Sequence, residues 1–331
     1  VGFANKTGLF NIGASGQFIV GAYVAVLMGV KCTFIPGPLL WLACLLGAML
    51  AGAVWGLVPG FLKAVCNVNE VIACIMMNYI GMYGVNFLIQ LTVFDSLKNQ
   101  SLPVAENANA PKLGMDLIFR SGATASSANA GIFIAVLAGV VIYYLIEKTK
   151  FGYELKACGY NRDAARYAGI NETRSIVLSM VIAGALSGLG GACLYLAGAG
   201  KGIEVLDTLA AEGFNGIPVA LLAVNNPIAV IFTAIFMSVL DIAGLQLTNL
   251  TAYNEYITDV IIAAIVYLSA FSLVIRMLLD GRKKKRKSGG APADDAPVEP
   301  AQSLGDPELH PDPAITDPGA EAPIAEGGEQ A

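Results

Sequence analysis

Residues 39–58 read LLWLACLLGAMLAGAVWGLV, a run of twenty positions without a charged side chain. A helix of about 20 apolar residues is long enough to cross the hydrocarbon core of a bilayer. The composition agrees, because 56% of the 331 residues are hydrophobic and 14% are charged, whereas soluble domains carry about 25% charged residues. An ordinary soluble protein is therefore excluded.

Further apolar segments lie on both sides of this run, and each is predicted to form a helix. They cover residues 12–30, 71–93, 130–146, 176–198, 206–224, 228–247 and 257–279. The 206–224 segment contains Glu212, Asn215 and Pro218, so it is either a full span or a broken, re-entrant one, which needs cover from protein or water. The predicted fold class is an all-α polytopic membrane protein with about eight transmembrane helices.

Charge divides the chain into two parts. Residues 288–331 hold ten acidic side chains and no Lys or Arg, whereas residues 1–287 hold 15 acidic and 20 basic ones. The second part is rich in Pro and Ala and poor in large apolar residues, so it cannot offset the entropy of ordering. We predict a transmembrane domain over 1–287 and a disordered acidic tail over 288–331, with no nucleic-acid partner.

Lys and Arg in short loops predict the orientation, since such loops stay in the cytoplasm. Six basic residues lie in the loop 147–175, and a second group follows the last apolar segment at 282–287. Four predicted spans separate the two groups, an even number, so both lie inside. The C-terminus and the turn formed by Asn225, Asn226 and Pro227 are then cytoplasmic, and the loop 94–129 is external.

Several chemistries are excluded by composition and spacing. The single histidine is His310, inside the tail, and the six cysteines show no C-x-x-C spacing, so neither a metal site nor histidine catalysis is predicted. The stretch Gly198–Gly202 lacks the Ser or Thr and the earlier Gly of a phosphate loop. We expect no catalytic residue and no ATP hydrolysis by this chain.

Small residues four apart indicate how the helices pack. Gly52 and Gly56 form one such pair, and Gly184 and Gly188 form another. Between membrane helices this spacing lets backbones approach closely. The pattern predicts a tight bundle but does not distinguish channels, transporters and intramembrane enzymes.

Polar side chains at membrane depth are costly unless they are paired or face water. One segment holds six such residues, Asn69, Glu70, Asn78, Tyr79, Asn86 and Gln90. They either contribute to a solute path or, for Asn69 and Glu70, cap the helix start. Glu212 and Asp241 are the deepest acids. They would serve the alternative hypothesis, an ion-coupled secondary transporter of a small polar solute.

Residues 151–175, FGYELKACGYNRDAARYAGINETRS, form a basic cytoplasmic stretch. Asn161 is a candidate N-cap and Gly169 a candidate stop for a short helix between them. Its exposed face would present Arg162, Arg166 and Tyr167 to a cytoplasmic partner. The other interpretation is a solvated connector whose charges only set the orientation.

The same stretch resembles the cytoplasmic coupling region of ABC importer permeases of the ribose and branched-chain amino-acid type. The family pattern G-x-N-x-x-A-A-x-x-x-G-I is matched in full over residues 159–170. The resemblance implies that this region contacts an ATPase. The residues to which it assigns this role are Gly159, Asn161, Arg162, Ala164, Ala165, Arg166, Tyr167, Gly169 and Ile170.

Three further stretches resemble the same family. Residues 8–17, GLFNIGASGQ, are similar to its GLFNIGAEGQ element, with Ser15 in place of Glu. Residues 67–72, NVNEVI, with 76–80, MMNYI, look like the element of the nucleoside and simple-sugar branch. Residues 213–222, GFNGIPVALL, resemble the late motif of the family.

The resemblance implies a multi-pass permease subunit in the inner (plasma) membrane of a prokaryote. Its expected partners are a cytoplasmic ABC ATPase that binds ATP and Mg, a second permease subunit in a homo- or heterodimer, an external solute-binding lipoprotein and the lipid membrane. This chain would bind no cofactor. Family members begin with helices upstream of the GLFNIG element, so we expect the sequence from Val1 to be truncated at its N-terminus.

The expected cargo is a nucleoside or a simple sugar, with branched-chain amino acids third. Amide, carboxylate and phenol groups suit hydrogen bonds to a neutral polyol or a nucleobase. The residues predicted to line or shape the path are Asn11, Gln17, Asn69, Glu70, Asn78 and Tyr79.

Overall fold

The computed structural model describes residues 1–114, 129–198, 200–250, 256–268 and 271. The chain divides into two units, Val1–Leu279 and Asp280–Ala331. The predicted acidic tail, the basic group at 282–287 and part of the external loop lie outside the described residues.

The described part is almost entirely helical, as predicted for a polytopic membrane protein. Six helices are long and apolar enough to cross a membrane. They are α2 (Ala14–Lys31), α3 (Gly37–Cys66), α4 (Glu70–Thr92), α6 (Gly131–Lys148), α9 (Glu172–Tyr195) and α11 (Pro227–Leu250). The shorter elements are α1 (Gly2–Lys6), α7 (Lys150–Tyr160), α8 (Arg162–Tyr167), α10 (Ala211–Leu222), the 3-10 helix η1 (Glu106–Ala108) and an apolar helix over Tyr256–Leu268.

Two predicted spans have different bounds in the structure. The run at 39–58 belongs to the 30-residue helix α3, which continues through Pro59 to Cys66. The segment 206–224 is not a continuous helix, because only the 12 residues of α10 are helical. Twelve residues rise about 18 Å, too little for a bilayer core of about 30 Å. This is the broken alternative, in which extended backbone before α10 completes the segment.

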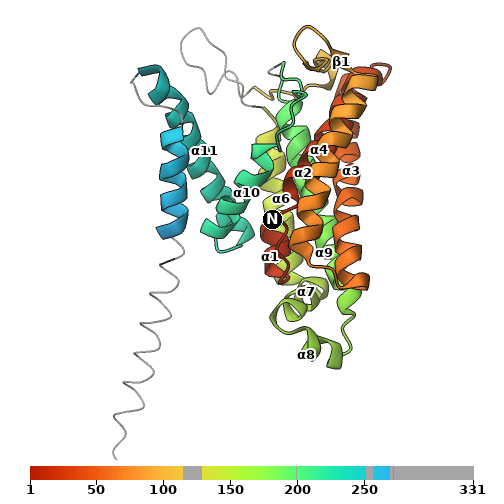
Figure 1. The fold of residues 1–331 in the computed structure, drawn as a ribbon, viewed down its shortest axis with the longest axis vertical. Helices are drawn as coiled ribbons and strands as arrows, with labels where there is room; N and C mark the ends of the chain where they lie inside the picture. Colours follow the sequence, from red (N-terminus) through yellow and green to blue (C-terminus); the bar gives the residue numbers. More distant parts are fainter. Residues whose placement is uncertain (115–128, 199, 251–255, 269–270, 272–331) are drawn as a thin grey trace, which may run out of the picture. The chain divides into compact units, whose positions relative to one another are not determined.

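The centre of the bundle is a close contact between α3 and α9, with α2 packed against both (Figure 1). A Cβ added to Gly52 would lie 2.3 Å from the carbonyl oxygen of Gly184, and one added to Gly188 would lie 2.3 Å from that of Ala48. Only glycine permits such an approach between backbones. The predicted small-residue packing is confirmed.

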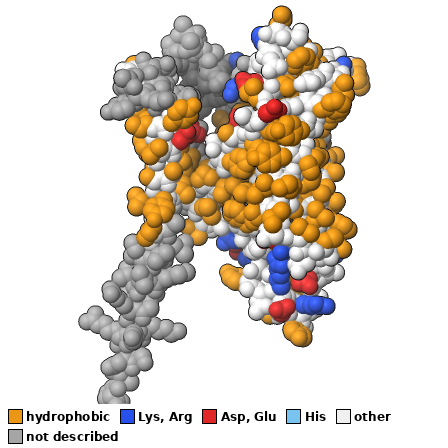
Figure 2. All heavy atoms as spheres, in the orientation of Figure 1, with side chains coloured by type: hydrophobic (Ala, Val, Ile, Leu, Met, Phe, Trp, Pro, Cys, Tyr) orange, Lys and Arg blue, Asp and Glu red, His pale blue; other side chains and the backbone are white. Residues whose placement is uncertain are grey.

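The two ends of the bundle carry different elements (Figure 1). The helices α7 and α8 lie at one end, and a hairpin of β1 (Phe94–Asp95) and β2 (Gln100–Ser101) lies at the other, with Phe94 opposite Ser101. Between them, hydrophobic side chains cover the outer face and charged ones gather toward the ends (Figure 2). Leu50 of α3 and Leu91 of α4 are 68% and 66% exposed, as expected of residues that contact lipid.

Candidate translocation cavity and coupling surface

A cavity of about 380 Å³, lined by both polar and apolar residues, lies toward the hairpin end of the bundle. Its wall combines three long helices, strand β2 and the non-helical chain before α10. Among its lining residues are Ser15, Ile19, Met82, Asn86, Gln100, Tyr195, Lys201, Glu204, Thr208 and Glu212. The volume suits a small molecule, and the mixture of amide, carboxylate, hydroxyl and apolar groups suits a solute that has both polar and apolar parts.

The extended backbone before α10 is held by side chains of the neighbouring helices. Asn86 of α4 donates from Nδ2 to the carbonyl oxygen of Leu206 at 2.9 Å. Ser15 of α2 donates from Oγ to the carbonyl oxygen of Ala210 at 2.8 Å. Non-helical backbone at membrane depth is tolerated where protein covers it or where it lines a cavity, and both conditions hold here.

The floor of the cavity lies inside the bundle. The backbone N–H of Gly16 donates to Asn78 Oδ1 at 2.8 Å, and Asn78 is eight residues into α4, about 12 Å from its start. A Cβ on Gly213 would lie 2.3 Å from Cα of Ser15, so the N-termini of α2 and α10 meet there. Discontinuous helices that begin near the middle of the membrane are typical of transporter binding sites.

Three of the predicted path residues form one buried network instead of lining the cavity. Asn11, Gln17 and Asn78 are 0%, 1% and 1% exposed. Asn11 Nδ2 donates to Gln17 Oε1 at 2.9 Å, and Asn78 Nδ2 donates to the carbonyl oxygen of Ile12 at 3.0 Å. These hydrogen bonds hold the loop before α2 against α4, so the three side chains can shape the cavity floor.

The other three predicted path residues lie apart from this network. Asn69 caps α4 by accepting from the backbone N–H of Val71 at 2.9 Å, and Glu70 pairs with Lys63 at 2.8 Å. Tyr79 is 46% exposed. The structure thus confirms that Asn69 caps α4. A part of Asn69, Glu70 and Tyr79 in a solute path stays a prediction.

The sequence pattern did not single out most of the polar residues that line the cavity. Asn86 was grouped with the polar residues of α4, and Glu212 was assigned to the alternative hypothesis. Gln100, Lys201 and Glu204 lie outside the predicted helices, and Thr208 lies in the segment 206–224, which is not helical before α10. The polar residues Lys201, Glu204, Asp207 and Thr208, close before α10, were the available signal. Asp241, on α11, is exposed and is not part of the cavity lining.

A larger cavity of about 770 Å³ lies between α1, α6 and α11. Its lining is almost wholly apolar, with Ile132, Val136, Ile142 and Ile231 among its members. It has few groups that could replace the hydration of a polar solute. The smaller cavity is therefore the better candidate for translocation.

The coupling region forms two short helices, of which the capping pattern predicted the second, α8. Asn161 Oδ1 accepts from the backbone N–H of Ala164 at 3.0 Å, which caps α8. Gly169 follows with φ +79°, a conformation that favours glycine. Ala165 is buried, whereas Arg166 is exposed and Tyr167 is 94% exposed.

The remaining residues of the coupling motif are either half-buried or exposed. Arg162, predicted to be on the exposed face, is half-buried, as are Gly159 and Ile170. Ala164 and Asn161 are exposed. The outward surface of α8 is therefore formed by Asp163, Ala164, Arg166 and Tyr167.

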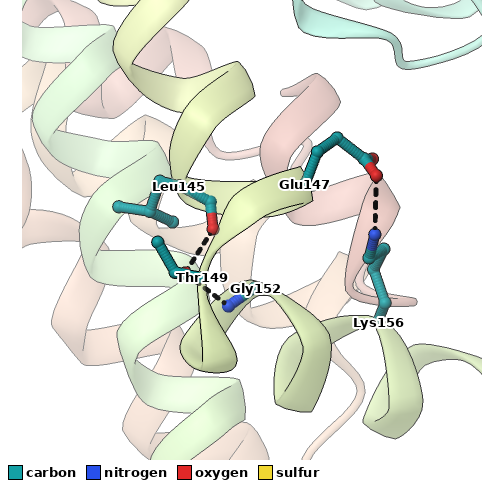
Figure 3. Close-up of polar contacts among 5 residues, drawn as sticks. All are labelled: Leu145, Glu147, Thr149, Gly152 and Lys156. Atoms are coloured by element: carbon teal, nitrogen blue, oxygen red, sulfur yellow. Dashed lines mark hydrogen bonds and ion pairs between the residues drawn. The ribbon is translucent and has the colours of Figure 1, made fainter.

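The turn from α6 to α7 fixes the position of the coupling helices (Figure 3). Thr149 Oγ1 donates to the carbonyl oxygen of Leu145 and accepts from the backbone N–H of Gly152 at 3.1 Å. Lys156 pairs with Glu147 at 2.8 Å across the same corner. A Cβ at Gly152 would lie 2.3 Å from the carbonyl oxygens of Leu145 and Ile146, so the corner requires glycine.

The coupling helices also touch the loop that leads to the cavity floor. A Cβ on Gly8 would lie 2.8 Å from Cα of Gly159, and Gly8 has φ +73°. Gly8 lies in the loop that carries Asn11 and ends at Gly13, the N-cap of α2. A shift of α7 would therefore press directly on the loop that shapes the cavity floor.

Comparison with known proteins gives consistent matches. The model of the family "branched-chain amino acid transport system / permease component" matches residues 2–270. The chain is 37% identical over 288 residues to the guanosine ABC transporter permease protein NupP of Bacillus subtilis, covering 86% of this chain and 80% of that protein. It is 35% identical over 290 residues to the nucleoside ABC transporter permease protein NupB of Lactococcus lactis, covering 86% and 78%.

A third relative is the glucose ABC transporter permease protein TsgB13 of Haloferax volcanii, 28% identical over 292 residues, covering 87% of this chain and 76% of that protein. No solved structure matches the chain significantly.

Proposed function

The chain belongs to the family of branched-chain amino acid transport system permease components and is a membrane-spanning permease, and from this premise we propose that it imports nucleosides with energy from a separate ABC ATPase. The observation that carries the proposal is the 37% and 35% identity to permeases named for guanosine and nucleosides. The permease named for glucose is less similar, at 28%. Simple sugars are therefore the second candidate cargo.

The chemistry of the cavity supports a nucleoside. Glu204 and Glu212 supply acceptors for ribose hydroxyls, and Asn86 supplies an amide that can both donate and accept. Ile19 and Met82 supply apolar surface for a base. A neutral solute of this kind needs no buried counter-charge, which is costly in a membrane.

The partners follow from the two ends of the bundle. The ATPase, with its bound ATP and Mg, would dock on α7 and α8, which makes that end and the C-terminus cytoplasmic. A solute-binding protein would deliver nucleoside at the hairpin end, and a second permease subunit would complete the membrane part. ATP hydrolysis belongs to the ATPase.

In the proposed mechanism, closure of the ATPase pair displaces α8 and α7. Because Gly159 contacts Gly8, the displacement moves the loop before α2. The start of α2 moves with this loop, and the hydrogen bond from Ser15 to Ala210 then moves the chain before α10. The cavity then changes the side from which it is open, in an alternating-access cycle.

Uptake competition tests the cargo. Cells that express the complete transporter should take up radiolabelled guanosine, and unlabelled nucleosides should compete with it. Excess ribose, glucose or leucine should compete weakly. Stronger competition by a sugar than by any nucleoside would reject the nucleoside proposal and favour the second candidate.

Charge reversal tests the docking surface. Arg166→Glu should reduce recovery of the ATPase with the affinity-purified permease at least about tenfold, since it reverses the charge of an exposed side chain on the proposed docking surface. Lys31→Glu, at the hairpin end, is the matched control and should leave recovery unchanged. Equal recovery with both variants would move the docking site away from α8.

A further inference from the structure

The external hairpin does not stand free of the cavity, because it pairs with the chain that forms the cavity wall. The backbone N–H of Ser101 donates to the carbonyl oxygen of Ile203 at 2.8 Å, and that of Val205 donates to the carbonyl oxygen of Asn99 at 3.0 Å. Gln100 and Glu204 stand opposite each other in an antiparallel bridge. The two-stranded hairpin 94–101 and the segment 202–205, which pairs with β2 through this bridge, together form a cap over the cavity.

Side chains add to this pairing on both sides of the bridge. Asn99 Nδ2 donates to the carbonyl oxygen of Val205 at 3.1 Å. Ser101 Oγ accepts from the backbone N–H of Ile203 at 2.9 Å, and Ser101 is fully buried. A buried hydroxyl with a backbone partner is a specific contact that is costly to leave unmade.

The inner face of the cap lines the cavity. Gln100 and Glu204, the bridged pair, are both lining residues, as are Gly202 and Ile203. The opposite end of the cavity is closed by Ser15 and the start of α10. The cap therefore covers the cavity at the hairpin end.

Two glycines precede the wall half of the cap. Gly198 and Gly200 have φ +76° and +66°, and no heavy atom lies within 4 Å of a Cβ placed on Gly200. Glycine in open space can change its backbone angles at low cost. Rotation at Gly200 can therefore move the wall half of the cap while Ser15 holds its far end.

We propose that the cap is the external gate of the cavity, and that the pairing of residues 99–101 with 203–205 must break to admit the solute. This inference rests on the proposed function and adds to it a specific closing element. The hairpin tip, where Leu97 is 95% exposed, is the part of the gate that the external solute-binding protein would contact.

A reversible cross-link across the cap tests the proposal. Opposed residues of a hydrogen-bonded antiparallel pair have Cα atoms about 5.5 Å apart, which suits a disulfide. Asn99→Cys with Val205→Cys places the two thiols beside the Gln100–Glu204 bridge, at residues joined by a backbone hydrogen bond and outside the cavity lining. The single variants are matched controls, because they carry the same native cysteines and the same local change.

The expected result is a loss of guanosine uptake that depends on the link. In the complete transporter, oxidation of the double variant should lower uptake about tenfold or more, since a covalent link removes the open states of the cap, and a reductant should restore it. The single variants should be unaffected by oxidation. Uptake that persists with the link formed would overturn the gate, while transport by the reduced protein would still uphold the proposed function.

Two other outcomes are also decisive. If both thiols react with a maleimide but do not link, the strands are not paired and the gate is overturned. If even the parent chain takes up no nucleoside, the proposed function fails and the gate is tested by access alone. A membrane-impermeant maleimide should then label Thr208→Cys more slowly when the cap is linked, and equal labelling rates would overturn the gate.

Discussion

Asn78 connects two helices through the backbone groups that it satisfies. It accepts from the N–H of Gly16 and donates to the carbonyl of Ile12, while the N-cap residue of α2, Gly13, supplies no side-chain oxygen. The first N–H groups of a helix need partners from outside the helix. Asn78 therefore caps α2 from α4.

Asn78→Leu should lower the free energy of unfolding in detergent by about 2 kcal/mol or more, because two buried backbone groups lose their partner. Tyr79→Phe, one position along on an exposed face, should change it by about 0.5 kcal/mol or less. Reversible denaturant titration measures both. If Asn78→Leu keeps its stability but loses uptake, the residue contacts solute instead, as the sequence-based prediction had it.

For single residues, the sequence was a better guide to which polar side chains are important than to what each of them contacts. Polar residues in apolar helices are costly, so Asn78 could be singled out on that ground, whereas Asn11 and Gln17 were singled out with the stretch 8–17 that resembles the permease family. Whether each faces a cavity or a backbone group depends on its neighbours in space. Gln100 and Glu204 could not be found this way, because their positions follow from a pairing between segments about 100 residues apart.

At the scale of elements, the contact between α3 and α9 depends on glycine. Gly184→Val should lower the unfolding free energy by about 3 kcal/mol or more, since its Cβ alone would lie 2.3 Å from the carbonyl oxygen of Gly52. Gly84→Val is the matched control, because no heavy atom lies within 4 Å of its Cβ, and it should cost about 1 kcal/mol or less. Similar losses for the two variants would show that α3 and α9 are not packed as described.

The corner between α6 and α7 makes a separate prediction about coupling. Gly152→Ala should displace α7, because a Cβ there meets two backbone carbonyls. We expect guanosine uptake to fall about tenfold or more even where the protein reaches the membrane in normal amount. Gly169→Ala, in open space but with φ +79°, tests backbone strain alone and should have the smaller effect. Equal effects would mean that the corner does not transmit motion.

Most of the elements were predictable because hydrophobic runs and caps are local signals. Asn161 and Gly169 placed α8 within a residue, and apolar runs placed the six long helices. The break before α10 was foreseen only as one alternative, because Pro218 and Glu212 suit a broken helix and a polar face equally. The hairpin was not predicted, since its strands are two residues each and their partner segment is distant in sequence.

At the scale of the whole molecule, the structure joins two ends that the sequence treats separately. The coupling helices touch the loop that leads to the cavity floor, and the hairpin pairs with the cavity wall. Force from an ATPase and delivery by a receptor can therefore act on one cavity from opposite sides. The alternative hypothesis of an ion-coupled transporter used Glu212 and Asp241, and of these two acids only Glu212 lines the cavity.

The most direct test of this account is guanosine uptake into proteoliposomes that contain the permease, its ATPase and the external solute-binding protein. The account predicts accumulation that requires ATP on the ATPase side, is insensitive to a collapsed proton or sodium gradient and survives joint Glu212→Gln and Asp241→Asn substitution with at most a few-fold loss. Uptake by the permease without the ATPase, driven by an ion gradient and abolished by that double substitution, would contradict it.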